Sequence, residues 1–337
     1  MIKVALDVMG GDHAPQEIIE GGLLAVSELN DLQLFFVGPL NILEDYLRHR
    51  SYPQKRVEQI HAPEIITNDD QPVMAVRRKK KSSMITAIKM VSDGKCDAMV
   101  SAGNTGALMV GSLLIAGRLQ GIERPALTVV APTFQAGNVV LLDLGANMDA
   151  TAQQLFHYGL MGAIYAREVL GKPSPRVGLL NVGVEEIKGT EQIKKAYQLM
   201  KENLPGFVGN VEARYVLDGV ADVVVSDGFS GNIFLKTVEG LVSGMFGALK
   251  NAFTGSVKGK LGAVLLKTEL VALKSKFDYS EYGGAPLLGI NGIYIKGHGS
   301  SKARAIRSAI VNQAYRYARQ AVNDKIENEL SILATKM

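Results

Sequence analysis

The stretch VVVSDGFSGNIFLKT, residues 223–237, begins with three valines, passes through a turn of small polar residues and continues with helically spaced apolar residues. The stretch SAGNTGAL, residues 101–108, follows the same order of strand, turn and helix. Strands that are apolar at consecutive positions suit a parallel sheet covered on both faces. Both stretches therefore predict strand–turn–helix units of an α/β protein.

Similar apolar runs recur along most of the 337 residues, with helically spaced segments between most of them. We expect strands at 2–8, 32–37, 57–62, 97–101, 127–131, 139–144, 176–182, 208–211, 222–226 and 293–296. Only about seven residues, with Gly137-Asn138 among them, join 127–131 to 139–144, which predicts an antiparallel hairpin. The pattern predicts a three-layer α/β/α fold with a mixed, mainly parallel sheet.

Composition excludes several classes of protein. The formal net charge of +4 is too small to indicate nucleic-acid binding, and no zinc-type spacing accompanies it. A single cysteine, Cys96, precludes an internal disulfide, and we expect it to be buried. The N-terminus does not resemble a signal peptide, and no apolar run reaches the roughly 20 residues of a membrane span. We expect a cytoplasmic protein.

Four predicted strand ends carry small and polar residues, at the edge where open α/β sheets bind ligands. The candidate substrate-binding residues are Asp7, Gly10, Gly11, Asp12, His13, Ser101, Gly103, Asn104, Thr105, Gly106, Asp143, Asn147, Ser226, Gly228, Ser230, Gly231, Asn232 and, after the last strand, Lys296. Glycines admit a ligand close to the backbone, and the N–H groups of a first helical turn favour an anion. For any one loop the commoner explanation is a helix cap or a tight turn.

Three further segments are candidates for the site. In NVGVEEIKGTE, residues 181–191, Lys188 could hold a phosphate or polarise a carbonyl, or could be a solvated surface charge. The second is YGGAPLLG, residues 282–289. The third is HGSS, residues 298–301, which precedes the final predicted helix and could bind an anion there or could merely cap the helix.

These segments together resemble the PlsX family of phosphate acyltransferases. The matching segments are LDVMGGDHAP (6–15), PVMAVRRKKKSSM (72–84), SAGNTGAL (101–108), LLDLGANMDA (141–150), LLNVGVEEIKGTE (179–191), VVVSDGFSGNIFLKT (223–237), YGGAPLLG (282–289) and IKGHGSS (295–301). They occur in order from the first strand to the last helix. One departure is Val184, where family members often carry a small polar or acidic residue.

The resemblance implies a fold similar to the isocitrate and isopropylmalate dehydrogenases and to phosphotransacetylase. In that fold one mixed sheet forms a single domain, here residues 1–337, with a cleft between two intertwined lobes, and the protein is a homodimer. The implied reaction transfers a long-chain fatty acyl group from acyl carrier protein to inorganic phosphate, without a cofactor. The acyl phosphate would pass to a downstream membrane acyltransferase for phospholipid synthesis.

Such a reaction requires orientation and oxyanion stabilisation more than a strong acid, because a thiolate is a good leaving group. We assign phosphate to the loops 101–106 and 226–232. Lys188 or His298 would stabilise the oxyanion or protonate the thiolate, and Asp227 or Asp12 would accept a proton from phosphate. We expect no metal, because no histidines form a close ligand pair, although Asp218, Asp222 and Asp227 resemble metal-binding carboxylates of related dehydrogenases.

Residues 245–277 form a basic helical segment with an apolar side, carrying six lysines against one glutamate. It could contact the inner face of the cell membrane, the acidic acyl carrier protein, or a second copy of the chain. The expected contact residues are Lys258, Lys260, Leu261, Val264, Leu265 and Lys267. The basic run 77–81 is a second candidate docking patch, or a solvated helix end.

Three other functions remain open at this stage. One is an NAD-dependent dehydrogenase of the isocitrate type, although no G-x-G-x-x-G follows a strand. Another is a phosphotransacetylase-like enzyme that uses an acyl-CoA. The last is a lipid-binding scaffold without activity, which would not require four polar loops at strand ends.

Overall fold

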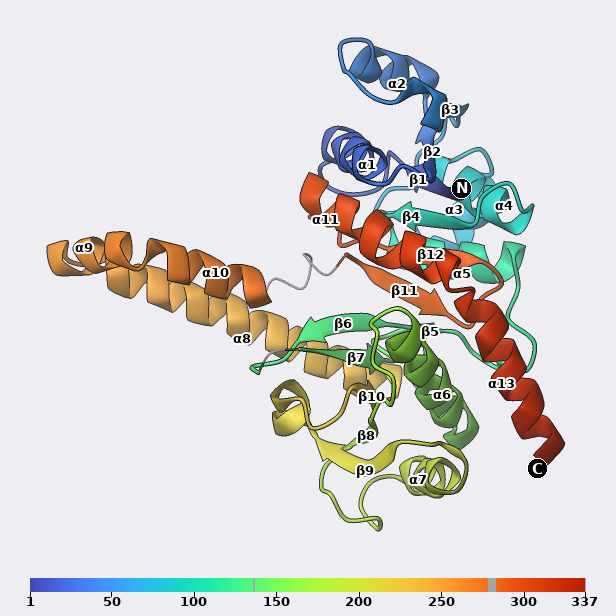
Figure 1. The fold of residues 1–337 in the computed structure, drawn as a ribbon, viewed down its shortest axis with the longest axis vertical. Coiled ribbons are helices and arrows are strands. Elements are labelled where there is room, and N and C mark those ends of the chain that lie inside the picture. The colour runs from blue at the N-terminus through green and yellow to red at the C-terminus, as the bar shows by residue number, and fades with distance from the viewer. Residues whose placement is uncertain (136, 278–282, 337) are drawn as a thin grey trace.

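The computed structural model describes residues 1–135, 137–277 and 283–336. Its larger sheet has seven strands in the order β3-β2-β1-β4-β12-β11-β5 (Figure 1). Their bounds are Val57–His61, Leu32–Gly38, Ile2–Asp7, Ala98–Ser101, Ile293–Lys296, Ala285–Leu288 and Ala126–Leu127. The first five are parallel, and β11 is antiparallel to both of its neighbours.

A second sheet has five strands in the order β6-β7-β10-β8-β9. Their bounds are Val129–Pro132, Asn138–Leu142, Val223–Val225, Val177–Asn181 and Phe207–Glu212. The pair β6–β7 is the predicted antiparallel hairpin, and the other pairs are parallel. The prediction of a mixed, mainly parallel arrangement is confirmed.

The expectation of one sheet is corrected, because the predicted strand 127–131 divides at Thr128. The backbone N–H of Thr128 donates to Pro286 O at 3.1 Å, which belongs to the larger sheet, while Val129 pairs with Leu141 in the smaller one. A strand was also missed: β11 lies inside the stretch 282–289, which was predicted as a site segment and not as a strand. Tyr282 of that stretch lies outside the described residues.

Helices cover both faces of the larger sheet, which makes three layers. Alternate residues of β1 enter different cores: Leu6 packs with α1 (Gln16–Glu28) and α11 (Ala303–Ser308), and Ala5 with α4 (Ser83–Ser92). The remaining elements are α2 (Leu40–Leu47), η1 (Gln54–Arg56), α3 (Pro72–Arg78), α5 (Thr105–Ile115), α6 (Ala152–Glu168), α7 (Glu191–Asn203), η2 (Ala213–Asp218), η4 (Ala309–Tyr315), α12 (Arg316–Arg319) and α13 (Val322–Lys336).

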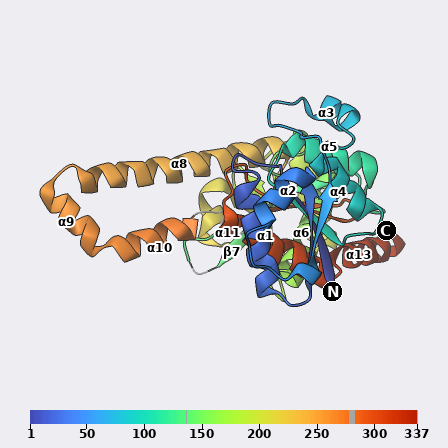
Figure 2. The same cartoon turned by 90° about the horizontal axis from the view of Figure 1, so that it is seen from above.

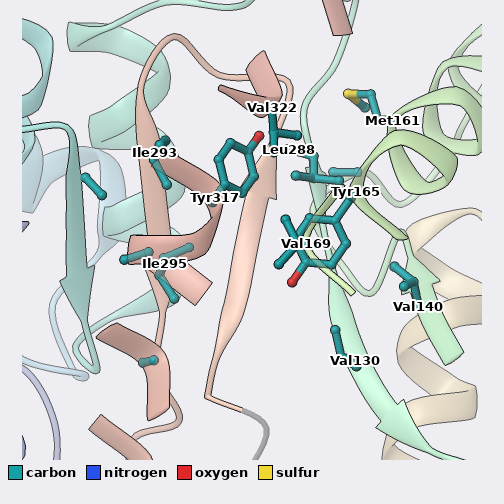
Figure 3. Packing of buried hydrophobic residues seen from close by; sticks show 14 of the residues in the cluster. Val130, Val140, Met161, Tyr165, Val169, Leu288, Ile293, Ile295, Tyr317 and Val322 are labelled. Carbon is teal, nitrogen blue, oxygen red and sulfur yellow. The ribbon is translucent and has the colours of Figure 1, made fainter. Parts of the chain in front are cut away.

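The two sheets share one continuous core. Figure 3 shows Val130 and Val140 of the smaller sheet near Tyr165 of α6 and Val169 just after it, with Leu288 of the larger sheet nearby. Apolar area removed from water at this junction contributes roughly 25 cal/mol per Å² to stability. The junction therefore packs the two sheets and α6 into one core.

Three helices form an arm that projects from the two sheets (Figures 1 and 2). They are α8 (Gly228–Thr254), α9 (Val257–Leu265) and α10 (Lys267–Phe277). The predicted basic segment 245–277 therefore covers the last ten residues of α8 and both following helices. At about 1.5 Å per residue, the 27 residues of α8 extend about 40 Å. Among the described residues, no helix has both the length and the apolar character needed to cross a membrane.

Candidate active site

Three neighbouring strands of the larger sheet end in buried polar residues. Asp7, Ser101 and Lys296 terminate β1, β4 and β12, which are adjacent and parallel, so their side chains meet at one edge. Ser101 Oγ donates to Asp7 Oδ2 at 2.6 Å. Lys296 Nζ donates to Ala102 O at 3.3 Å and also to Gly297 O. The sequence pattern had placed all three in the site, and the structure brings them together.

Burial changes the proton affinity of this group. It raises the pKa of Asp7, against the opposing hydrogen bond from Ser101. It lowers the pKa of Lys296 to about 8, while Asp12 and Asp7 act in the opposite direction. Lys296 is therefore a cation at neutral pH that can lose its charge under mildly alkaline conditions.

The loop after β1 approaches its neighbours too closely for a side chain at Gly10. A Cβ there would lie 2.7 Å from both Asp7 Oδ2 and Gly103 N. Gly11 has a φ of +110°, and Asp12 N donates to Gly299 O at 2.8 Å. The glycine turn thus joins the loop after β12, while the side chains of Asp12 and His13 are exposed.

The start of α5 is a helix cap that also holds a neighbouring loop. Asn104 Oδ1 accepts from Ala107 N at 3.0 Å, and its Nδ2 donates to the carbonyls of Thr67, Asn68 and Asp70. Gly103 N donates to Ser101 Oγ at 3.1 Å. Of the residues predicted here, Thr105 is the exposed one, and Gly106 lies against Pro72.

His298 follows β12 and faces the base of the arm. The Ser300 N–H donates to Nδ1 at 3.2 Å, so neutral imidazole carries its proton on Nε2. Partial burial and the nearby charge of Lys296 lower the pKa of His298. His298 is consequently a neutral group at pH 7 that can donate a hydrogen bond through Nε2.

The smaller sheet contributes a second group of strand-end residues. The buried carboxylate of Asp143 accepts from Leu127 N, Ala146 N, Asn147 N and Asn147 Nδ2 at 2.7–3.1 Å. Burial raises its pKa, and these donors oppose the rise. Asn147 Nδ2 also donates to Pro125 O at 2.7 Å. Asp143 and Asn147 therefore organise their own loop.

The start of α8 is fastened to that loop. Ser226 Oγ donates to Asp143 O at 3.1 Å, and Gly228 N donates to Asn147 O at 2.8 Å. Gly231 lies directly over Asp143 O, where a Cβ would clash. The glycines of this stretch serve close packing of two loops.

The predicted proton acceptor Asp227 is the N-cap of α8. Its carboxylate accepts from Ser230 N at 2.7 Å and from Ser230 Oγ at 3.1 Å. Within the described residues, the amide of Asn232 in the next turn has no protein hydrogen-bond partner. Asp227 and Ser230 are engaged in the helix cap, so the amide of Asn232 is the group in this stretch that can bind a ligand.

Lys188 lies in the exposed loop after β8. The loop is held by Asn181 Nδ2, which donates to Lys188 O at 3.1 Å, and by Asn210 Nδ2, which donates to Glu185 O at 2.9 Å. The ammonium group has no hydrogen bond or ion pair to any described residue. Lys188 follows β8 of the smaller sheet, whereas His298 follows β12 of the larger sheet, so the two residues lie near different strand ends.

An apolar cavity of about 840 Å³ adjoins His298. Phe234, Val238 and Val242 line it from α8, opposite β6, β7 and α10. Pattern analysis missed these residues, although their spacing of four residues indicates one face of a helix. The cavity links the polar strand ends to the base of the arm.

Two further expectations concern Cys96 and metal ligands. Cys96 is buried, as predicted, and burial together with Asp97 raises the pKa of its thiol to about 12, which leaves it protonated at neutral pH. No group of three or more histidine, cysteine or carboxylate side chains within the described residues could hold a metal ion. Asp222, one of the three carboxylates considered, is instead paired with Lys172 and Arg176.

A family model described as fatty acid synthesis protein matches residues 2–325. The chain belongs to this family. Curated relatives named phosphate acyltransferase come from Alkaliphilus oremlandii, at 48% identity over 98% of both chains, and Brevibacillus brevis, at 50% identity over 98% of this chain and 97% of that one. The predicted resemblance is confirmed, and this member of the fatty acid synthesis protein family is an acyltransferase.

Solved structures support the fold. A phosphotransacetylase from Streptococcus pyogenes aligns with a TM-score of 0.64 at 18% identity, over 94% of each chain. The EutD phosphotransacetylase from Staphylococcus aureus aligns with a TM-score of 0.62 at 13% identity, over 94% of each chain. At these identities the likeness shows that the family member has an α/β fold of this type.

Proposed function

We propose that the protein is a phosphate acyltransferase that moves a long-chain fatty acyl group from acyl carrier protein to inorganic phosphate. The observation that carries this proposal is its identity of about one half, over nearly the whole chain, to relatives named phosphate acyltransferase. The strand-end loops add donors suited to an anion, and the cavity beside His298 adds apolar surface suited to an acyl chain.

In the proposed reaction, a phosphate oxygen attacks the thioester carbonyl carbon. A C–O bond forms, the C–S bond breaks, and the thiolate leaves and takes up a proton. Lys188 and Asn232 are the candidates for stabilising the oxyanion, because neither side chain is engaged elsewhere in the described chain. His298 would supply a hydrogen bond or proton from Nε2, and the exposed Asp12 would orient phosphate, a role for which Asp227 is less suited as a helix cap.

The arm supports the remaining expectations about partners. Leu261, Val264 and Leu265 on α9 are each more than 60% exposed, and Lys258, Lys260 and Lys267 flank them. Exposed apolar residues among lysines suit a peripheral contact with an anionic membrane or with acyl carrier protein. Along α8, the exposed Leu241 and Met245 suit contact with a second copy, as in the proposed homodimer.

A phosphotransacetylase-like reaction with an acyl-CoA is the second candidate, favoured by the fold of the solved structures. The narrower assignment to an isocitrate-dehydrogenase-like fold and the description as two intertwined lobes stay predictions. The dehydrogenase reaction has no specific observation in its favour.

The deciding experiment incubates the protein with palmitoyl acyl carrier protein, with and without phosphate, and measures free thiol and acyl phosphate. We expect phosphate-dependent thiol release in a one-to-one ratio with acyl phosphate. Absence of that release would reject the proposal. A higher kcat/KM with acyl-CoA than with the carrier-protein thioester would favour the second candidate.

A further inference from the structure

The basic run 77–81 divides into one structural lysine and four unpaired cations. Lys79 Nζ is bonded to Asp70 Oδ2 at 2.5 Å and to Ile65 O at 2.9 Å. The other four side chains are exposed and have no hydrogen bond or ion pair to any described residue; they are Arg77, Arg78, Lys80 and Lys81. Four unpaired cations within five residues form a local positive surface, which we call the α3 patch.

The topology places the α3 patch at the same edge as the candidate site. Residues 62–82 connect the carboxyl end of β3 to the start of α4, and β3 is parallel to β1, β4 and β12. The whole connection therefore lies at the carboxyl edge of the larger sheet. Figure 2 shows α3 beside α5 there.

Direct contacts attach this connection to the site. Asn104 at the start of α5 donates to three carbonyls of 67–70, and Asn68 Nδ2 donates to Asp12 Oδ1 at 3.4 Å. Pro72, the first residue of α3, packs against Gly106. At about 1.5 Å per residue, Arg77 lies about 8 Å along the helix from that contact.

Local carboxylates leave the patch positive. Asp70 is held by Lys79, and Glu64 Oε2 accepts from the backbone N–H of Lys81 at 2.8 Å. Val73 is 41% exposed and lies four residues before Arg77, so an apolar side chain shares the face that carries the charges. An apolar side chain surrounded by basic ones is complementary to a protein surface that has an apolar centre and an acidic rim.

We propose that the α3 patch is the docking surface for an acidic protein that delivers the acyl thioester. This inference rests on the proposed function, because an acyl group carried by a protein requires a landing surface beside the reacting centre. Charges at the rim of an interface mainly accelerate encounter, and salt screens them. The patch should therefore govern the KM for a protein-borne substrate and leave the chemical step unchanged.

The test replaces the patch and compares two substrates. The variant carries Arg77→Gln, Arg78→Gln, Lys80→Gln and Lys81→Gln. The matched control removes the same number of charges at the opposite, amino-terminal edge of the sheet, with Arg48→Gln, Lys55→Gln, Lys89→Gln and Lys95→Gln. Each protein is assayed with palmitoyl acyl carrier protein and with uncharged palmitoyl pantetheine.

We expect the patch variant to raise the KM for the carrier-protein substrate at least about fivefold, with kcat and the KM for phosphate unchanged. Palmitoyl pantetheine should react equally with all three proteins. In the wild-type protein, added NaCl should raise the KM for the carrier-protein substrate and not that for palmitoyl pantetheine, a readout that needs no variant.

Two results would overturn the docking role. One is an equal KM for the carrier-protein substrate in the patch variant and the control, with no dependence on salt. The other is loss of binding to phosphatidylglycerol vesicles in the patch variant with that KM unchanged, which would assign the patch to lipid. If the wild-type protein shows no phosphate-dependent thiol release from either thioester, the proposed function itself fails, and the docking role with it.

Discussion

Most polar side chains at the strand ends already have partners within the folded chain. Asp143, Asn147, Asn104 and Asp227 are occupied as caps or loop fasteners, which their residue types favour with or without a ligand. Lys188 and Asn232 differ because their functional groups are not engaged by described residues. Among these side chains we therefore expect Lys188 and Asn232 to contact the reacting groups.

Lys188→Ala tests this distinction. If the ammonium stabilises the oxyanion, turnover should fall by at least about tenfold, with little change in thermal midpoint because the side chain is exposed. The measurement is kcat with saturating acyl carrier protein thioester and phosphate, beside the melting curve. Lys195→Ala, a neighbouring position on α7, is the control and should retain activity; near-normal kcat in the Lys188 variant would remove Lys188 from the mechanism.

Gly10→Ala tests the close approach of the first loop. The added Cβ would lie 2.7 Å from Asp7 Oδ2 and from Gly103 N, both parts of a buried cluster that cannot move freely. We expect a loss of about 1–3 kcal/mol in the free energy of unfolding, from overpacking, and a marked loss of activity. Gly240→Ala in α8, where a Cβ would meet no other part of the described chain within 4 Å, should be neutral or slightly stabilising. Equal denaturation midpoints of the two variants would contradict the argument.

Between elements, Asp222 links the amino ends of β8 and β10. Its carboxylate accepts from Arg176 N at 2.9 Å and forms ion pairs with Lys172 at 2.7 Å and Arg176 at 3.0 Å. Burial would raise its pKa, but these donors outweigh burial and lower the pKa to about 2. The group therefore stabilises the fold as a carboxylate, above its unfolded pKa of about 4.

Asp222→Asn should lower the free energy of unfolding by about 1–3 kcal/mol at pH 7, because it removes the negative charge that Lys172 and Arg176 bind. Since the folded pKa is depressed, the contribution is lost as the pH falls from about 4 through about 2. Urea unfolding of both proteins between pH 7 and pH 2 would show the difference shrinking toward zero. A difference that stays constant over this range would mean that the ionised form contributes nothing.

How far the sequence predicts these elements depends on whether local residues decide them. Runs such as 293–296 are strands as expected, because a short run of consecutive apolar residues is typical of a fully buried strand. The strand β11 was missed, because Pro286 and the preceding Gly283-Gly284 are typical of a loop. The division at Thr128 depends on its bond to Pro286, which is distant in sequence, so no local pattern could reveal it.

The candidate site was predictable to a similar degree. The rule that ligands bind at carboxyl strand ends selected Asp7, Ser101 and Lys296 as candidates, and the structure places them together because their strands are adjacent. Their role in binding a ligand stays a prediction. Asparagine and aspartate at a helix start look alike as caps and as ligand donors, so the capping by Asn104 and Asp227 required the structure.

For the molecule as a whole, the cavity between the smaller sheet and the arm is the candidate site for the acyl chain. Val238 lines this cavity from α8, while Leu241, three residues later, is 69% exposed on the same helix. If the cavity receives the acyl chain, Val238→Trp fills space that a long chain needs and a short chain does not. We expect kcat/KM for a palmitoyl thioester to fall at least about tenfold, as steric exclusion of several methylenes allows, with that for a butyryl thioester nearly unchanged. Leu241→Trp should preserve the ratio. An equal loss for both chain lengths, together with a changed oligomeric state on gel filtration, would instead assign the cavity to packing between two copies of the chain.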